Sequence, residues 1–196
     1  MAAEAGTRRR IVESAMQLFW EHGYERTAIS DIVAAARVRS GSLYHFFATK
    51  EELLIAVLEA YLGSLEPQVM DPAFAAAADP LERVFAVLDG YRRAILGTDF
   101  RYRCPIGSLA LEMQNASTRA RELVDRNFAA WRASIASCLR DASPALRDDV
   151  DSDSLAAFVL TVMEGGVMQA SAERAIERYD ESVRHLRTYL ASLQRR

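Results

Sequence analysis

The chain has 196 residues, of which 51% are apolar and 26% charged, and its formal net charge is −3. This balance supports a packed core and excludes a disordered chain, and the nine Gly and five Pro exclude a fibrous or loop-rich protein. Two distant cysteines, Cys104 and Cys138, exclude a disulfide framework and a cysteine-based zinc site. We expect no secretory signal. We also expect no membrane span in the most apolar stretch, 155–170, because it is short and contains Thr161 and Glu164.

Apolar residues at helical spacing and the abundance of Ala, Leu, Arg and Glu predict an all-α protein. The first helix ends before Gly23, a typical C-cap. A capping box of Thr49 and Glu52 opens a later helix, and Asp79 caps another. The weakly patterned stretch 64–79 predicts a boundary between two modules. The expected helices span 7–22, 27–36, 40–47, 49–63, 80–96, 104–114, 117–141, 153–173 and 180–194.

Basic residues gather at the start of the chain. Residues 1–50 hold seven bases and five acids, whereas the remaining residues hold 17 bases and 22 acids. This asymmetry favours the first 50 residues as the surface that would meet a polyanion. A solvated surface with a chance asymmetry is the alternative. Arg8, Arg9 and Arg10 could reach a DNA backbone, but we expect them to be solvated.

Residues 27–47 have the pattern of a helix-turn-helix unit, in which two short helices and a tight turn place the second helix in a DNA major groove. Gly41 leaves room for a close approach to the duplex. An ordinary helical hairpin with its polar side in solvent is the alternative interpretation. The apolar residues that would form a shared core are Ile29, Ile32, Val33, Val38, Leu43 and Phe47.

One set of residues extends through this unit and the helix before it: Ala15, Leu18, Phe19, Gly23, Tyr24, Thr27, Asp31, Ile32, Ala36, Val38, Gly41, Leu43, Tyr44, Phe47, Lys50 and Glu51. With this set, the N-terminal region resembles the DNA-binding module of the TetR family of transcriptional regulators. Glu164-Gly165-Gly166 and the final amphipathic helix resemble that family's C-terminal half. Two positions depart from the family pattern, because Arg37 stands where Gly is common and Arg39 where a Ser cap is common. Arg37 would be strained at positive φ unless its turn is αR-like.

The resemblance implies an all-α, homodimeric repressor with two domains. Residues 1–48 would form an N-terminal helix-turn-helix three-helix module that reads a palindromic double-stranded operator. Residues 49–196 would form a C-terminal helical ligand-binding and dimerisation domain. A small hydrophobic effector would release this cytoplasmic repressor from DNA, and the helix after Thr49 would link the effector chamber to the DNA module.

Hydrogen-bonding chemistry and the matched positions select the expected DNA contacts. Thr27 is expected at a helix N-terminus, where its hydroxyl and backbone amides could hold a phosphate. Arg39 is the candidate for a bidentate contact to guanine, and Tyr44 and Lys50 are candidates for phosphate contacts. The full predicted set is Thr27, Arg37, Arg39, Ser40, Gly41, Ser42, Tyr44, His45 and Lys50.

The last two predicted helices carry apolar stripes typical of a dimer seam. Gly165 and Gly166 in mid-helix each cost about 1 kcal/mol relative to Ala, and the close approach of another helix would offset this cost. Two such helices from each subunit would form a four-helix bundle. The alternative is that the stripes pack only within their own domain. The predicted seam consists of Leu155, Phe158, Val162, Gly165, Gly166, Gln169, Val183, Leu186, Leu190 and Leu193.

The middle of the chain, 80–141, is rich in large apolar and aromatic residues. Each fits an ordinary core, and the resemblance implies an effector pocket there. The candidate lining is Phe85, Leu88, Tyr91, Tyr102, Cys104, Met113, Phe128 and Trp131. Cys104 precedes Pro105 and lies near Arg101 and Arg103, so a thiolate that senses electrophiles or oxidants is an alternative function. A small buried residue that starts a helix is the preferred interpretation of Cys104.

No signature of catalysis is found in the sequence. It has no Glu-x-x-His, His-Glu-x-x-His, phosphate-loop or Gly-x-Ser-x-Gly pattern, so we expect no enzyme, no metal and no cofactor. Glu181 and His185 lie one turn apart, which favours a surface ion pair over a metal site. The remaining alternatives are a small all-α enzyme with an apolar chamber and a helical module whose first 50 residues bind protein.

Overall fold

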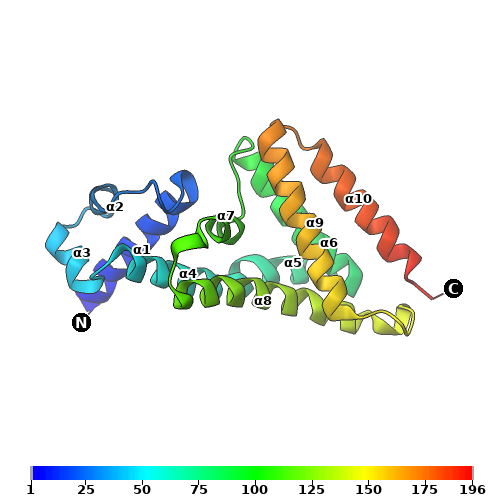
Figure 1. The fold of residues 1–196 in the computed structure, drawn as a ribbon. Helices are drawn as coiled ribbons and strands as arrows, with labels where there is room; N and C mark the ends of the chain where they lie inside the picture. Colours follow the sequence, from blue (N-terminus) through cyan, green and yellow to red (C-terminus); the bar gives the residue numbers. More distant parts are fainter. Residues whose placement is uncertain (1, 196) are drawn as a thin grey trace. The chain divides into compact units, whose positions relative to one another are not determined.

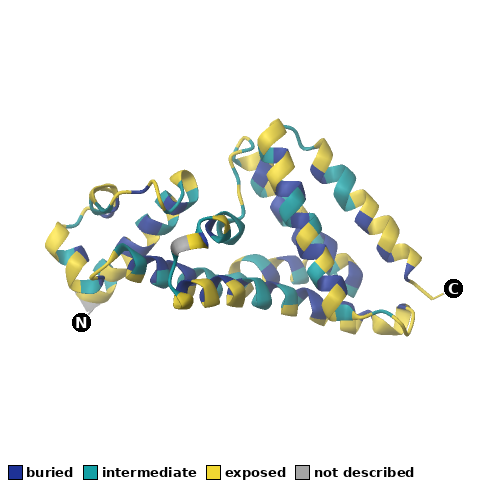
Figure 2. Cartoon of the chain, in the orientation of Figure 1, coloured by how far each residue is buried: buried dark blue, intermediate teal, exposed yellow. Residues whose placement is uncertain are grey.

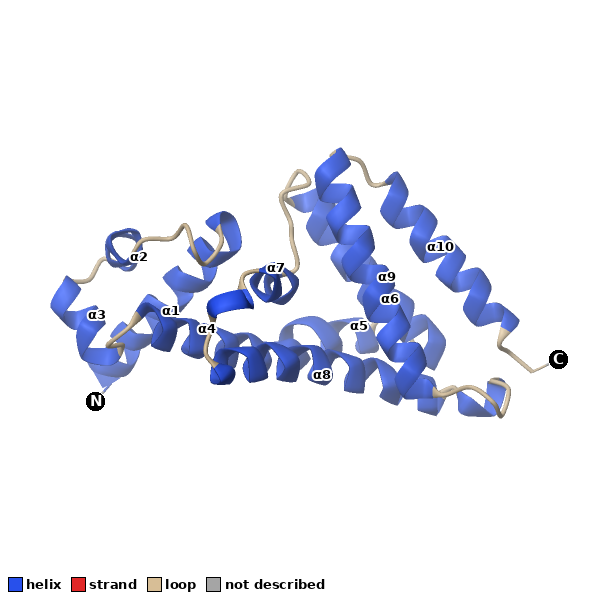
Figure 3. Ribbon diagram, viewed as in Figure 1, coloured by secondary structure: helices blue, strands red, loops and turns tan. Residues whose placement is uncertain are grey.

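The computed structural model describes residues 2–195, and the regular elements in that range are helices (Figures 1 and 3). The predicted all-α class is therefore confirmed. The chain divides into two compact units. Unit 1 consists of Met1–Gly63 and Pro105–Phe128, and unit 2 of Ser64–Cys104 and Ala129–Arg196. This division follows compactness, and the division by function into 1–48 and 49–196 stays a prediction.

Unit 1 combines the predicted helix-turn-helix region with a second segment from the middle of the chain. The expected cap of Thr49 forms, because Thr49 Oγ1 accepts from the Glu52 N–H at 3.1 Å. The Glu52 carboxylate reaches one residue further back than a capping box requires and accepts from the Ala48 N–H at 2.7 Å. Ile11 and Leu109, which are 98 positions apart, share one core. The elements are α1 (Ala2–His22), α2 (Ile29–Ala36), α3 (Ser40–Phe46), α4 (Lys50–Leu65), α7 (Pro105–Leu111), the 3₁₀ turn η2 (Met113–Asn115) and the start of α8 (Thr118–Asp141).

Unit 2 is built around α6 and α9, whose apolar faces are buried. Asp79 caps α6 as predicted, since its Oδ1 accepts from the N–H groups of Leu81 and Glu82 at 2.9 and 3.0 Å. In Figure 2, α9 carries buried positions along its length, whereas α10 is mostly exposed or half-buried. The elements are η1 (Glu66–Met70), α5 (Asp71–Ala75), α6 (Pro80–Gly97), the end of α8, the 3₁₀ turn η3 (Ser143–Ala145), α9 (Ser152–Glu173) and α10 (Glu177–Ser192).

The stretch 64–79, which the sequence predicted as a boundary between two modules, is largely helical, and the change from unit 1 to unit 2 falls at its start, between Gly63 and Ser64. α4 continues into the π-helical turn η1 and then into α5. Pro67 and Pro72 lie within this continuous helical run, where each lacks the N–H that would bond to a preceding carbonyl. The prolines therefore do not end the helical run.

Two helical stretches, Lys50–Ala75 and Ser152–Glu173, are long and apolar enough to cross a membrane by length and composition alone. The expectation that 155–170 is too short for this was wrong, because α9 extends over 22 residues. The most apolar part of the first stretch is 33% buried inside the chain, and that of the second is 44% buried. Core helices of soluble proteins have the same length and composition, so this observation is weak support for a membrane span.

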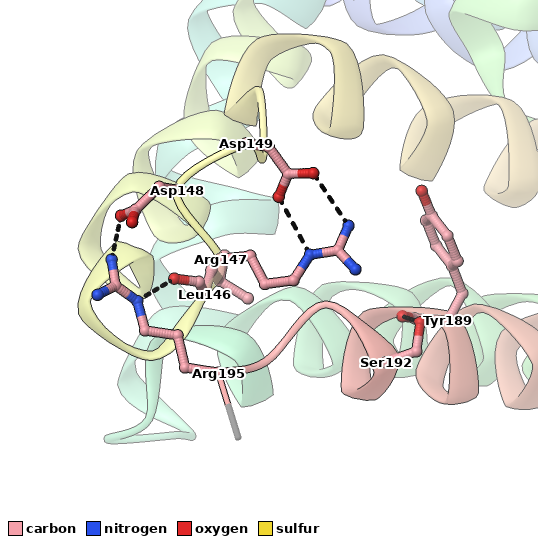
Figure 4. A network of polar contacts seen from close by, with 7 residues as sticks. All are labelled: Leu146, Arg147, Asp148, Asp149, Tyr189, Ser192 and Arg195. Carbon is pink, nitrogen blue, oxygen red and sulfur yellow. Dashed lines mark hydrogen bonds and ion pairs between the residues drawn. The ribbon is translucent and has the colours of Figure 1, made fainter.

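Residues 193–195 are hydrogen-bonded to the loop between α8 and α9 (Figure 4). The Arg147 N–H donates to the Leu193 carbonyl and the Arg195 N–H to the Ala145 carbonyl, both at 2.9 Å. The Arg195 guanidinium donates to the Leu146 carbonyl at 2.6 Å and pairs with Asp148. These bonds fix the C-terminal end of α10 against η3 within unit 2.

Candidate nucleic-acid interface

The second helix of the predicted helix-turn-helix, α3, has one buried and one exposed face. Leu43 and Phe47 are 0% and 3% exposed and belong to the unit 1 core. Tyr44 is 54% exposed. The other predicted contacts on this helix are exposed or, for Ser42, half-buried: Arg39, Ser40, Gly41, Ser42 and His45. The polar face of α3 is therefore open, as contact with a major groove requires.

The turn between α2 and α3 is left-handed at Arg37, where φ is 53° and ψ is 48°. The Arg37 N–H donates to the Ala34 carbonyl and the Val38 N–H to the Val33 carbonyl, both at 3.2 Å, which closes the end of α2. The backbone strain predicted for Arg37 at positive φ is thus present, and it lowers the stability of the fold by about 1–2 kcal/mol. Arg39 is the N-cap of α3 without a side-chain cap bond.

Replacing Arg37 with Gly is expected to raise the free energy of unfolding by about 0.5–1 kcal/mol, because Gly adopts positive φ without a steric cost. The same change removes an exposed cation from the predicted DNA face, so affinity for DNA is expected to fall. Urea denaturation measures the first effect and a gel-shift titration the second. Arg174→Gly is the matched control, because Arg174 is the left-handed C-cap of α9 in unit 2. Equal stability of Arg37→Gly and the wild type would contradict the strain.

Thr27 has a structural position that the sequence did not indicate. Its side chain is 1% exposed, and its hydroxyl lies 2.7 Å from the Gly23 carbonyl and 3.2 Å from that of Leu18, which ties the α1–α2 turn to the end of α1. α2 begins at Ile29 with Ala28 as its N-cap. This geometry contradicts a phosphate contact through the Thr27 hydroxyl and leaves the backbone amides at the start of α2 as candidates.

Lys50 makes two contacts with the α1–α2 turn. Its ammonium donates to the Glu25 carbonyl at 3.3 Å and lies 4.4 Å from the centre of the Tyr24 ring. Partial burial lowers the pKa of Lys50, and the charges of Glu25 and Glu112 oppose this. An ammonium group has three donors, so Lys50 can bind the carbonyl and still reach a phosphate.

The predicted dimer seam divides into inward and outward residues. Leu155, Leu186, Leu190 and Leu193 are 1–7% exposed within their own chain, so their packing follows the alternative interpretation of the stripe. Phe158 is 45% exposed. Val162, Gly165 and Val183 are half-buried, and Gln169 is exposed.

A surface groove lies between α9 and α10 in unit 2, and we call it the α9–α10 groove. Some of the exposed residues that line it were not predicted from the sequence. Tyr189 is 47% exposed and meets Phe158 edge to face, with ring centroids 5.7 Å apart. The groove has a volume of about 500 Å³ and is lined by Phe158, Thr161, Val162, Gly165, Gly166, Gln169, Ser182, His185, Leu186 and Tyr189. The leucines that the 3/4 spacing picked out for the seam lie on the buried face of α10. Tyr189 and His185 lie on its exposed face.

The two mid-helix glycines differ in their surroundings. A Cβ on Gly166 would lie 2.8 Å from Cδ2 of Tyr179, so the close neighbour is α10 of the same chain. A Cβ on Gly165 would meet nothing within 4 Å. The predicted close approach of another helix is thus present at Gly166 within the chain, and Gly165 faces the open groove.

The predicted effector residues fall in both units: Met113 and Phe128 in unit 1, and the other six in unit 2. In unit 2, Trp131 Nε1 donates to the Tyr91 hydroxyl at 3.0 Å, and Tyr102 meets Tyr91 edge to face. Burial raises the pKa of Tyr91, as do the charges of Cys104 and Glu164, whereas the Trp131 bond lowers it.

Glu164 lies near Tyr91 and Cys104, although the sequence analysis named it only as part of the pattern shared with the TetR family. Burial raises the pKa of its carboxyl group, and a hydrogen bond with the Cys104 side chain opposes the rise. Its Oε1 is buried without a hydrogen-bond partner among the residues that the structure describes. Cys104 is half-buried and Cys138 is buried. A carboxyl group beside the thiol was not visible in the sequence, because the two residues are 60 positions apart.

Comparison with known proteins is consistent with this arrangement. Residues 11–57 match the model of bacterial regulatory proteins of the tetR family, and residues 80–184 match the C-terminal domain of LmrA/YxaF-like transcriptional regulators. The repressor DhaR of Mycobacterium sp. is 30% identical over 181 residues, which cover 91% of this chain and 89% of DhaR. The chain belongs to the TetR family of transcriptional regulators.

Solved structures of other TetR-family proteins have the same fold. A regulator from Chloroflexus aurantiacus superposes with a TM-score of 0.85 at 29% identity, over 100% of this chain and 99% of the other. A regulator from Rhodobacter sphaeroides gives 0.83 at 26% identity, over 91% and 95%. The expected helix-turn-helix module with a C-terminal helical domain is confirmed.

Membership in the TetR family also settles whether the chain is an enzyme. The family consists of transcriptional regulators that bind operator DNA and not of enzymes, so the enzyme alternative is excluded. The apolar helix α9 lies within the matched C-terminal domain of a TetR-family regulator, so its hydropathy fits a helix of that domain.

Proposed function

We propose that this TetR-family regulator is a cytoplasmic, ligand-responsive repressor that binds a palindromic operator as a homodimer. Residues 1–48 read the duplex, and residues 49–196 bind the effector and dimerise. The observation that carries the proposal is the open polar face of α3 opposite the buried Leu43 and Phe47. A short helix with such faces can enter a major groove while its apolar side holds it to the module.

Selection of bound duplexes from a random-sequence library tests this function. We expect a pseudo-palindrome with half-sites about one helical turn or a multiple apart, bound less tightly as salt rises. Footprinting of the selected duplex should show two protected major grooves on one face. Recovery of sequences without half-sites, or binding that does not depend on salt, would contradict operator recognition.

The α9–α10 groove is the proposed dimer seam. Phe158 and Tyr189 together expose an aromatic surface, and half-buried Val162 and Gly165 continue it along α9. Apolar surface of this kind gains free energy when a second copy covers it. Light scattering at micromolar concentration should give the dimer mass for the wild type, and a lower mass for Phe158→Glu.

The proposed effector is a small hydrophobic molecule that carries a hydrogen-bond donor. The aromatic side chains of Tyr91, Tyr102 and Trp131 suit an apolar ligand, and the unpaired Oε1 of Glu164 suits a donor group. The effector releases DNA only if it binds the free conformation more tightly than the DNA-bound one. A thermal-shift screen with matched hydrophobic phenols and their methyl ethers tests the donor requirement, because Glu164→Leu removes the acceptor oxygen and should reduce the preference for the phenol.

A thiol-sensing repressor is the second candidate, and the observation in its favour is that Cys104 is half-buried while Cys138 is buried. The neighbouring Glu164 carboxylate opposes a thiolate when it is ionised, because like charges repel. We therefore expect slow alkylation of Cys104 by iodoacetamide at pH 7, at a rate near that of an unactivated thiol. Mass spectrometry of the wild type and Cys104→Ser measures this rate. Fast modification accompanied by loss of operator binding would favour the sensor.

A further inference from the structure

Two acidic side chains join distant segments of unit 1 beside the predicted DNA-binding elements. Glu112, which follows α7, accepts the Glu25 N–H at 2.7 Å through its Oε2. Glu51, in the first turn of α4, accepts the Ser117 N–H at 2.7 Å through its Oε1. This bond lowers the pKa of Glu51. The segment from Glu112 to Ser117 is thus fastened at one end to the α1–α2 turn and at the other to α4.

The α1–α2 turn is shaped to receive the Glu112 carboxylate. Gly23 has φ +86°, and a Cβ there would lie 2.7 Å from Oε1 of Glu112. Only Gly leaves this space and adopts this φ without strain. Leu109 and Met113, on either side of Glu112, are 2% and 7% exposed in the unit 1 core. In Figure 1, α7 lies beside α1, with which it makes contact. The position of Glu112 is therefore fixed by packing.

The same turn holds Lys50. Glu25 receives Glu112 at its N–H and Lys50 at its carbonyl, on opposite sides of one residue. Tyr24 packs edge to face on Phe19 at 5.2 Å and presents its ring to the Lys50 ammonium. A shift of the Glu25 backbone would therefore move both partners of Lys50.

We propose that Glu112 is a positioning residue for DNA binding, which holds the α1–α2 turn so that Lys50 is placed for a phosphate. The inference rests on the proposed function, because it takes Lys50 as a phosphate contact. Glu112 itself touches no DNA in this account. Its carboxylate fixes the Glu25 backbone, and that backbone and Tyr24 fix the Lys50 ammonium.

The salt dependence of operator binding separates this role from a general structural one. Each phosphate contact contributes about 0.9 to the slope of log K against log salt, so loss of the Lys50 contact lowers the slope by about 0.9 per subunit. We expect Glu112→Ala to lower the slope by the same amount as Lys50→Ala. The double variant should have the slope of Lys50→Ala alone, because the two changes remove one contact. The probe is the duplex selected by the wild type.

Two variants complete the design. Glu112→Gln keeps an oxygen that can accept the Glu25 N–H and should retain the wild-type slope. Glu122→Ala removes an exposed acid from α8 in the same unit and should also retain it. If Glu112→Ala does not fold, Glu112→Asn replaces it, because its side chain is one methylene too short to reach the turn.

A wild-type slope in Glu112→Ala, or an additive effect in the double variant, would overturn the positioning role. A reduced slope in Glu112→Gln or Glu122→Ala would also overturn it, since charge alone would then explain the effect. If the wild type selects no duplex, the proposed function fails as well, and that result is distinct from a selected duplex whose slope ignores Glu112.

Discussion

Replacing Arg39 with Ala is expected to weaken binding to the selected operator by about 1–3 kcal/mol and to relax specificity at one base pair. Arg39 is exposed at the start of α3, and its side chain makes no cap bond to the helix. Its guanidinium can therefore contact O6 and N7 of a guanine. Gel-shift titrations against the operator and single-base variants measure both effects.

Arg126→Ala is the matched control for Arg39, because Arg126 is an exposed arginine on α8 in the same unit. It removes one cation at a distance in sequence from the helix-turn-helix and should leave base specificity unchanged. If Arg39→Ala weakens binding equally to all sequences, Arg39 is a phosphate contact. If neither affinity nor specificity changes, α3 does not read the duplex through this residue.

Replacing Gly166 with Ala is expected to lower the free energy of unfolding by about 1–2 kcal/mol, because overpacking outweighs the better helix propensity of Ala. The new Cβ would lie 2.8 Å from the Tyr179 ring. That ring is 1% exposed, and its hydroxyl donates to the Leu88 carbonyl at 2.7 Å, so it has little room to retreat. Urea denaturation at several protein concentrations measures the change.

Gly165→Ala provides a matched comparison on the same helix. Its Cβ meets nothing within 4 Å in the chain, so the monomer should gain about 1 kcal/mol from helix propensity. If a second copy covers the α9–α10 groove closely, the same methyl group should weaken the dimer, and light scattering would detect this. Stability of Gly166→Ala at or above the wild type would contradict the packing of Tyr179.

Several helix ends could be predicted from the sequence because they depend on interactions between residues close together in the chain. Three such signals were found where the pattern predicted them: the Asp79 cap before Pro80, the Thr49 cap of the Glu52 N–H, and Gly23 after α1. The alternation of apolar and polar residues in α3 was also sufficient to predict its buried and exposed sides. These features depend on periodicity and backbone geometry, which a single sequence contains.

Long-range placement could not be predicted in the same way. Glu112 accepts the N–H of a residue 87 positions away, and no local pattern predicts that pairing. A leucine stripe on α10 is equally consistent with a partner subunit and with α9 of the same chain, and the structure buries Leu186 and Leu190 within the chain. Thr27 was predicted at a helix N-terminus, but α2 begins at Ile29 and Ala28 is its N-cap.

The composition of unit 1 from two chain segments constrains how this protein can be recombined. Leu109, Leu123 and Val124 share a core with Ile11 and Leu43. An excised N-terminal fragment would therefore expose apolar surface that the later segment normally covers. Exchange of DNA specificity between relatives would succeed by grafting the surface of α3 and not by fusing an intact N-terminal segment. A single crossover would pair the new N-terminal segment with the recipient's own later core residues, among them Leu109, Leu123 and Val124.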